Sequence, residues 1–195
     1  GCAYPEETMR LKDKIAIVTG GGSGIGHATC LTFAREGAYV VVADRNAEAA
    51  AKVAEELKKA GGKGEALAVN VADSKAVKAM VEDVAARHGK LDILVNNAGY
   101  GIAGTVVNTT EEDWDALMAV NVNGVFYGCK HAIPIMEKQG GGVIVNTAST
   151  VSKVGIPNRA AYCASKGAVA SLTRAMALDH VDANIRVNCV APGTI

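Results

Sequence analysis

The stretch that decides the fold is Ile15-Ala-Ile-Val-Thr19, followed directly by Gly20-Gly-Gly-Ser-Gly-Ile-Gly26. A short, mostly β-branched run that stops at a glycine-rich turn is typical of a strand buried on both faces of a sheet. A helical pattern then covers residues 25–36 and stops at Gly37, a residue type favoured just past a helix end. The segment therefore predicts a strand, a tight turn and a helix.

A glycine turn in this position indicates a phosphate-binding site. Glycines let the backbone approach a pyrophosphate, and the helix N-terminus offers free N–H groups to it. The spacing is G-x3-G-x-G instead of the commoner G-x-G-x-x-G, and glycine-rich turns also serve as plain connections. Nucleotide binding is the favoured interpretation, and a plain turn is the alternative.

Apolar and amphipathic segments continue to alternate outward from this unit. We expect further strands at residues 39–43, 66–71, 91–95, 142–147 and 185–190. We expect helices at residues 46–60, 73–89, 110–138 (with a kink at Pro134) and 159–180. This alternation predicts an α/β protein with a doubly wound parallel sheet and helices on both faces, the Rossmann fold. No repeat or Pro-rich linker interrupts residues 9–195, so we expect one domain.

The composition excludes several classes of protein. The 195 residues contain 20 Lys+Arg and 20 Asp+Glu, so the chain lacks the basic excess of a nucleic-acid binder. A hydrophobic content of 49% argues against disorder, and no apolar stretch is long enough to predict a membrane span. Five cysteines without a C-x-x-C pair or a Cys/His cluster indicate reduced thiols, a cytoplasmic location and no metal site. Residues 1–8 precede Met9 and are interpreted as a non-native remnant or a disordered tail.

Ligands of such sheets bind beyond the carboxyl ends of the strands, so we expect the functional residues in the loops that follow the strands. Asp44 follows the second strand, where a carboxylate accepts hydrogen bonds from ribose hydroxyls and repels a 2′-phosphate. This favours NAD over NADP. The alternative is an exposed loop carboxylate, and Arg45 next to it either stacks on adenine, softens the repulsion or is simply solvated.

Two further loops carry polar residues. Asn96-Asn97-Ala98-Gly99 follows the fourth strand and suits a loop pressed against a cofactor, although a plain Asn/Gly-rich turn explains it equally well. Ser149 follows the fifth strand, and Tyr162 and Lys166 lie four residues apart in the next helix. Residues with that spacing share a helix face. A neighbouring ammonium favours the phenolate of a tyrosine, whose pKa is ordinarily near 10.

Together, these motifs resemble the short-chain dehydrogenase/reductase family. The resemblance runs from about Leu11 to Ile195 and includes Thr19-Gly20-x3-Gly24-Ile25-Gly26, the Asn96–Gly99 segment, Asn121, Ser149, Tyr162-x3-Lys166 and Pro192-Gly193. It implies an oxidoreductase that transfers a hydride between NAD(H) and a secondary alcohol or ketone. It also implies a cofactor site made of Gly20, Ser23, Gly24, Ile25, Gly26, Asp44, Asn70, Val71, Asn97, Ala98, Gly99, Tyr162, Lys166, Pro192, Gly193 and Ile195.

The resemblance assigns a catalytic role to four residues. Tyr162 is the acid-base, Ser149 holds the substrate oxygen, Lys166 lowers the tyrosine pKa and binds the nicotinamide ribose, and Asn121 holds a water that relays protons. The pattern departs from the family at Asn70, where many members have Asp; an asparagine there still donates and accepts hydrogen bonds.

Two other functions stay open. An NADPH-dependent 3-ketoacyl reductase of lipid synthesis would call for a basic residue in place of Asp44, and a non-catalytic cofactor-binding relative usually loses one of the four catalytic residues. The substrate pocket is expected at residues 100–104 and 150–159 and in a segment beyond Ile195. Family members are longer, so a lid, a helix and a seventh strand are expected to be absent from this chain. The alanine-rich helix at residues 159–180 and the family habit predict a homotetramer or homodimer.

Overall fold

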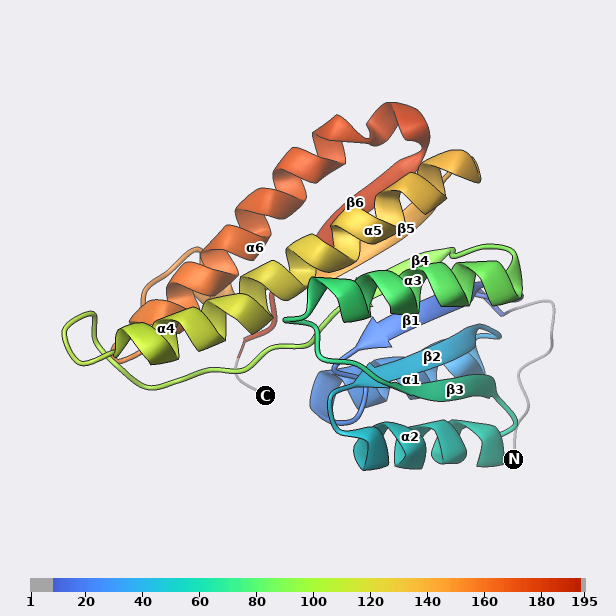
Figure 1. Ribbon diagram of the computed structural model, residues 1–195, viewed down its shortest axis with the longest axis horizontal. Helices are drawn as coiled ribbons and strands as arrows, with labels where there is room; N and C mark the ends of the chain where they lie inside the picture. The colour runs from blue at the N-terminus through green and yellow to red at the C-terminus, as the bar shows by residue number, and fades with distance from the viewer. Residues whose placement is uncertain (1–8, 194–195) are drawn as a thin grey trace.

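A computed structural model describes residues 9–193 of the chain. The expectations about residues 1–8, about Ile195 and about a segment beyond it lie outside the described residues. Within them, six strands form one parallel sheet in the order β3-β2-β1-β4-β5-β6 (Figure 1). The strands are β1 (Ile15–Thr19), β2 (Tyr39–Asp44), β3 (Lys63–Ala68), β4 (Ile93–Asn96), β5 (Gly142–Thr147) and β6 (Ile185–Val190).

Helices connect the strands and cover both faces of the sheet. They are α1 (Gly24–Arg35), α2 (Ala47–Lys59), α3 (Ser74–His88), α4 (Glu111–Met118), α5 (Gly124–Lys138) and α6 (Ala160–Asp179), with a π-helix, η2 (Ala119–Asn123), between α4 and α5. Short 3-10 turns η3 (Thr150–Ser152) and η4 (Val181–Ala183) flank α6. The predicted doubly wound architecture is confirmed, and strand order reverses between β1 and β4, where such folds bind ligands.

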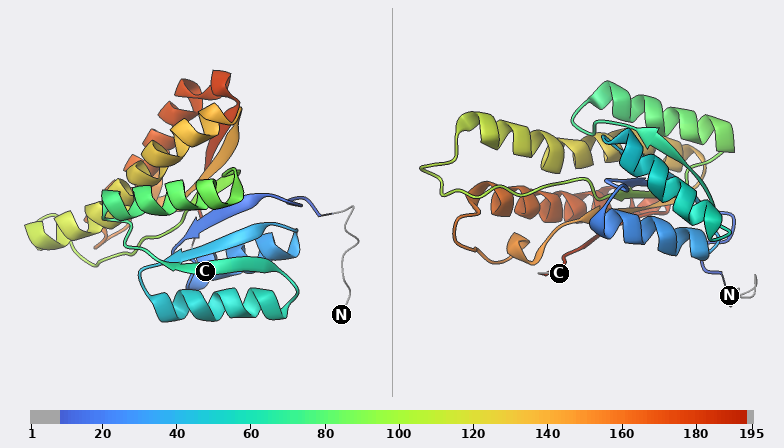
Figure 2. Two further views of the ribbon diagram at one scale, coloured as in Figure 1. Left: turned by 45° about the vertical axis from the view of Figure 1, so that its right-hand side comes forward. Right: turned by 90° about the horizontal axis from the view of Figure 1, so that it is seen from below.

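Strand side chains alternate between two apolar cores. Ile15 and Ile17 of β1 pack with buried residues of α3, α5 and α6, whereas Ala16 and Val18 pack with those of α1 and α2. Figure 2 (right) shows α3 and α5 on one side of the sheet and α1 on the other. Because a parallel sheet is buried on both faces, its strands are nearly continuous apolar runs, which is why β1 and β2 could be recognised in the sequence.

Three helices start with a side-chain cap. The side chains of Asn46, Asp73 and Thr110 accept hydrogen bonds from backbone N–H groups in the first turns of α2, α3 and α4. Each bond satisfies a donor that the helix itself leaves unpaired. In α1, by contrast, the N-cap residue Ser23 makes no such bond, and the first turn holds no acidic residue. The start of α1 thus keeps its N–H groups and its positive dipole for another partner.

The structure corrects three expected elements. The third strand spans Lys63–Ala68 instead of residues 66–71, because it pairs with all six residues of β2 and ends opposite Asp44. The fourth spans Ile93–Asn96 instead of residues 91–95. The single helix expected at residues 110–138 is interrupted by η2, while Pro134 lies inside α5.

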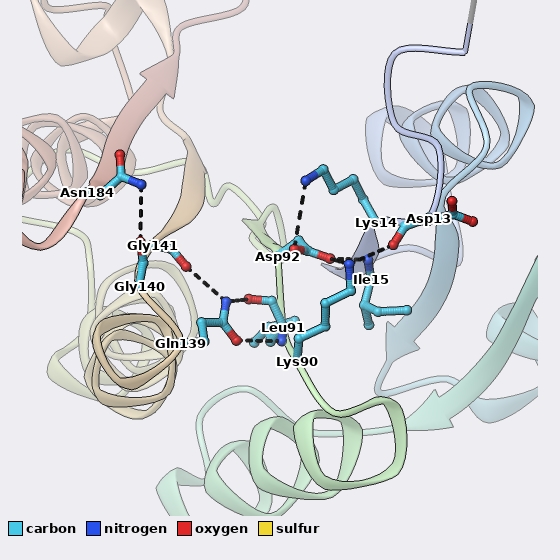
Figure 3. A network of polar contacts seen from close by, with 10 residues as sticks. All are labelled: Asp13, Lys14, Ile15, Lys90, Leu91, Asp92, Gln139, Gly140, Gly141 and Asn184. Atoms are coloured by element: carbon cyan, nitrogen blue, oxygen red, sulfur yellow. Dashed lines mark hydrogen bonds and ion pairs between the residues drawn. The ribbon is translucent and has the colours of Figure 1, made fainter. Parts of the chain in front are cut away.

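The amino-end loops of the central strands are joined by a polar network (Figure 3). Gln139 accepts a hydrogen bond from the Leu91 N–H at 3.1 Å and donates to the Leu91 carbonyl at 2.6 Å and the Gly141 carbonyl at 2.9 Å. Asp92 accepts a hydrogen bond from the Ile15 N–H at 2.8 Å and pairs with Lys90 at 3.0 Å. This network ties the starts of β1, β4 and β5 together at the edge opposite the candidate site.

Candidate active site

A cavity of about 640 Å³ opens at the carboxyl edge of the sheet and gathers most of the predicted site. The predicted residues that line it are Gly20, Ser23, Gly24, Ile25, Asp44, Asn70, Val71, Asn97, Ala98, Gly99, Ser149, Tyr162, Lys166, Pro192 and Gly193. They come from the end of β2, from the loops after the other five strands, and from the first turn of α1 and the first two turns of α6. Because all the strands are parallel, their loops meet at one edge.

The glycine turn forms one end of the cavity. Gly20 has a φ of +63°, and a Cβ there would lie 2.8 Å from the Ala98 Cα, so only glycine fits. Gly24, with a φ of +53°, faces open space at the first turn of α1. Gly26 does not line the cavity; a Cβ on it would overlap the Gly20 carbonyl oxygen, so its absence of a side chain allows α1 to pack against the turn. The result is an open backbone cradle at an uncapped helix N-terminus.

Asp44 closes the turn on its other side. Its Oδ2 accepts a hydrogen bond from the Gly22 N–H at 3.0 Å and its Oδ1 accepts one from the Asn46 N–H at 2.9 Å. The carboxylate is half-buried and lines the cavity beside Arg45. Both oxygens keep lone pairs that are free to accept hydroxyl donors.

Asn97 and Thr19 join the loops where strand order reverses. The Asn97 amide donates to the carbonyls of Thr19 and Gly20, both at 3.2 Å, and its Oδ1 accepts from the Thr147 hydroxyl at 3.3 Å. The Thr19 hydroxyl oxygen in turn accepts from the N–H groups of Asn97 and Ala98. Asn97 therefore holds three strand ends together beneath the cavity.

At the other end of the cavity lie Ser149, Tyr162 and Lys166. Ser149 is the N-cap of η3, where its Oγ accepts a hydrogen bond from the Val151 N–H at 3.4 Å and donates a long one, 3.5 Å, to the Pro192 carbonyl. The Lys166 Nζ lies 5.8 Å from the centre of the Tyr162 ring, as expected for residues four apart on α6. A hydroxyl, a phenol and an amine thus converge on one space.

Lys166 is almost completely buried, with 5% of its surface exposed. Its Nζ donates to the Thr147 carbonyl at 2.8 Å. Burial lowers the pKa of this amine from 10.5 to about 8, because the charged form loses its hydration.

Asn121 lies behind the cavity wall, in the π-helix, and is 1% exposed. Its Oδ1 accepts a hydrogen bond from the Tyr100 N–H at 3.0 Å, and its Nδ2 donates to the Tyr100 carbonyl at 2.8 Å and to Ser165 Oγ at 3.1 Å. A Cβ on Gly99 would lie 3.2 Å from Asn121 Oδ1 and 3.4 Å from Lys166 Nζ. Asn121 and Lys166 therefore both lie against Gly99, and Asn121 does not itself line the cavity.

Sequence reasoning missed some wall residues. Val69, Val120, Thr147 and Ala148 line the cavity. A position at the end of a strand could have indicated Val69, Thr147 and Ala148, which lie at or just after the ends of β3 and β5, whereas Val120 lies inside η2. Of the expected substrate pocket, Tyr100, Gly101 and Arg159 line the cavity, while residues 150–158 do not. In the described residues, no group of three His, Cys, Asp or Glu side chains could hold a metal ion. Among residues 9–193, no helix has the length and apolarity needed to cross a membrane.

Comparison with known proteins identifies the class. Residues 14–195 match the short chain dehydrogenase family. The chain is 44% identical over 187 residues to the meso-2,3-butanediol dehydrogenase of Serratia marcescens, covering 96% of this chain and 73% of that enzyme. It is 43% identical over 187 residues to a 3-oxoacyl-(acyl-carrier-protein) reductase of Thermotoga maritima, covering 96% and 76%. The crystal structure of an NAD⁺-bound xylitol dehydrogenase matches with a TM-score of 0.91 and 39% identity, covering 94% and 71%.

Fold, cavity and matches together define a dinucleotide-binding oxidoreductase. The chain belongs to the short-chain dehydrogenase family. The expected family, fold class and enzyme class are confirmed: it is an oxidoreductase acting on alcohol and carbonyl groups with a nicotinamide cofactor.

Proposed function

We propose that the protein oxidises a secondary alcohol or reduces the corresponding ketone with NAD(H), using Tyr162 as the acid-base. The observation that carries this proposal is that Ser149, Tyr162 and Lys166 line the same cavity as the glycine turn and Asp44. One space therefore offers a dinucleotide cradle at one end and proton-transfer groups at the other.

The residues present fit a dinucleotide. The open space at Gly24 and the uncapped start of α1 suit a pyrophosphate, Asp44 suits the adenosine ribose, and Lys166 suits the nicotinamide ribose. Asn70 is exposed beside the adenine end, and its Oδ1 accepts a hydrogen bond from the Ala72 N–H, which leaves its amide protons available. When bound, the cofactor supplies or accepts the hydride.

The chain's own residues supply orientation and proton transfer. Within residues 9–193 the Ser149 hydroxyl makes two hydrogen bonds, both long, so it can turn to donate to a substrate oxygen. Tyr162 takes the proton of an alcohol during oxidation and returns it during reduction. The Lys166 ammonium stabilises the phenolate by Coulomb attraction, which is strong in this buried environment. Asn121 holds the relay water through an acceptor oxygen, because both of its amide protons are already donated.

The names of the relatives support a small alcohol or ketone as substrate, since one acts on a butanediol and another on xylitol. Another relative is named as a 3-oxoacyl-(acyl-carrier-protein) reductase. The second candidate function is therefore the NADPH-dependent reduction of a ketoacyl substrate. We also propose a cytoplasmic homotetramer or homodimer.

The first test replaces Tyr162 with Phe. Turnover of a panel of diols, polyols, cyclic alcohols and ketones is followed by absorbance at 340 nm. We expect Tyr162→Phe to bind NADH as the wild type does and to lose turnover by about a hundredfold or more, since only the proton-transfer group is removed. Tyr127→Phe, a change in α5 outside the cavity, serves as the matched control and keeps turnover. Near-normal turnover in Tyr162→Phe would reject the acid-base assignment.

The second test concerns the choice of cofactor. We expect kcat/KM to favour NAD over NADP by about tenfold or more, because the Asp44 carboxylate repels a 2′-phosphate. The ratio of kcat/KM with NAD to kcat/KM with NADP is also measured for two variants. Asp44→Asn should lower this ratio, whereas Asp182→Asn, a change at an exposed residue of η4, should leave it unchanged. A wild-type preference for NADP would favour the ketoacyl reductase instead.

A further inference from the structure

Ser165 is a buried residue of α6 that lies between Tyr162 and Lys166 but does not line the cavity. It is 0% exposed and contacts two elements of the site at once. Its Oγ donates a hydrogen bond to the Tyr162 carbonyl at 2.8 Å and lies 3.1 Å from the Nδ2 of Asn121, 44 residues earlier in the chain. A buried side chain with hydrogen bonds to both Tyr162 and Asn121 can fix the position of one relative to the other.

The number of protons decides which way each hydrogen bond runs. A serine hydroxyl has one proton, and the Tyr162 carbonyl has none, so the hydroxyl donates to that carbonyl. Towards Asn121 the same oxygen acts only as an acceptor. The amide of Asn121 is therefore obliged to turn its NH₂ group towards Ser165.

This orientation matters for the cavity wall. With its NH₂ towards Ser165, Asn121 both accepts from the Tyr100 N–H and donates to the Tyr100 carbonyl. A flipped amide would bring its oxygen against two acceptors, Ser165 Oγ and the Tyr100 carbonyl, which is unfavourable. Tyr100 and Gly101 line the cavity, and a Cβ on Gly101 would lie 3.5 Å from the Tyr162 ring.

We propose that Ser165 is a positioning residue that fixes the Asn121 amide and thereby the Tyr100–Gly101 wall against Tyr162. It touches neither substrate nor cofactor space, and acts through Asn121 and the first turn of α6. Its consequence for turnover rests on the proposed function, whereas the fixed amide can be tested without it.

The chain offers a matched control two turns further along α6. Thr173 is 3% exposed, donates to the Val169 carbonyl at 2.8 Å and accepts from the Asn146 amide at 2.9 Å. Its hydrogen-bonding pattern is the same, but neither Thr173 nor Asn146 lines the cavity. Loss of either hydroxyl removes two hydrogen bonds, so the two variants separate a positioning role from a merely structural one.

The experiment compares Ser165→Ala, Thr173→Val and Ser165→Thr, which keeps the hydroxyl. Backbone amide shifts by ¹H–¹⁵N NMR report on the wall, NADH titration reports on the cofactor site, and absorbance at 340 nm gives kcat and KM. We expect Ser165→Ala to move the Tyr100 and Gly101 signals, to keep NADH affinity within about twofold, and to lower kcat about tenfold or more. Thr173→Val should leave the Tyr100 and Gly101 signals and kcat unchanged. Ser165→Thr, which keeps the hydroxyl, should also leave these signals and kcat close to those of the wild type.

The outcomes separate the two proposals. Unmoved Tyr100 and Gly101 signals in Ser165→Ala, or equal changes in Ser165→Ala and Thr173→Val, would overturn the positioning role. Unchanged kcat together with moved signals would also overturn it, since the wall would then not matter to turnover. A wild-type protein that binds NADH but turns over no substrate would instead defeat the proposed function, and the NMR comparison still judges Ser165. If Ser165→Ala fails to fold, Ser165→Cys replaces it, because a thiol is a weak acceptor.

Discussion

Lys166 combines burial with a catalytic assignment, and the two have opposite effects on its charge. The proposed mechanism needs an ammonium near Tyr162, whereas the structure buries the Nζ and gives it the Thr147 carbonyl as its acceptor among the hydrogen bonds of the described residues. Burial removes the hydration of the charged amine, which lowers its pKa from 10.5 to about 8. Below pH 8, the Lys166 amine is therefore charged in the folded protein, although this charge is more favourable in the solvated, unfolded chain.

This predicts a pH-dependent cost in stability. Because the folded state releases the Lys166 proton near pH 8 and the unfolded state near 10.5, the wild type gains stability as pH rises through that window. The penalty present below pH 8 is about 3 kcal/mol for such a shift. The unfolding free energy of Lys166→Met relative to that of the wild type should therefore be highest near pH 7. This advantage of the variant should decrease towards pH 10, because the wild type becomes more stable over that range. Denaturant unfolding at a series of pH values measures it.

An exposed lysine provides the control for that series. Lys153→Met, in the exposed loop after η3, is measured over the same pH series to show the effect of removing a surface lysine. A difference between Lys166→Met and the wild type that stays constant from pH 7 to pH 10 would mean that the Lys166 amine titrates alike in the folded and unfolded states.

Individual residues also show how far the sequence alone could go. Tyr162 and Lys166 were predictable because their helical spacing and chemistry are local. Ser165 sits between them in the printed sequence, yet its role depends on Asn121, and no local pattern brings the two together. The same holds for Asn121 itself, whose side chain faces Tyr100 and Ser165 instead of the cavity.

At the scale of elements, the bounds of the edge strand β6 were predictable, whereas those of β3, the strand at the opposite edge, were not. β3 starts with Lys63-Gly-Glu65, a poor apolar signal, because it lies at the edge of the sheet and is only partly buried. The expected apolar run included Val69 and Val71, which are buried in the loop after the strand. Apolar residues mark burial, and burial continues here past the end of the hydrogen-bonded ladder.

The π-helix η2 was beyond the reach of periodicity for a related reason. Five residues at Ala119–Asn123 shift the helical phase without any glycine or proline among them. Their geometry follows from long-range contacts, since Asn121 is tied to Tyr100 and Ser165. Irregularities of this kind occur often at functional sites, and this one contains Asn121, whose side chain lies against Gly99 of the cavity wall.

At the scale of the whole molecule, the carboxyl-terminal ends and the amino-terminal ends of the strands differ in structure. The carboxyl edge leaves an uncapped helix and a large cavity, whereas the amino edge is bound together by the network around Gln139 and Asp92 (Figure 3). No residue of that network lines the cavity. The hydrogen bonds that join the strand starts thus lie away from the cavity, at the opposite ends of the strands.

The last prediction tests that division. Gln139→Ala removes the acceptor of the Leu91 N–H and the donor to two carbonyls, so the unfolding free energy should fall by about 1–3 kcal/mol. The change lies at the far edge, so kcat/KM of the folded protein should stay within about twofold of the wild type. Lys138→Ala, the preceding exposed residue, controls for the loss of a side chain at the end of α5. If kcat/KM fell in step with stability, the amino-end network would have to reach the cavity through β4 and β5, and the two edges would act as one unit.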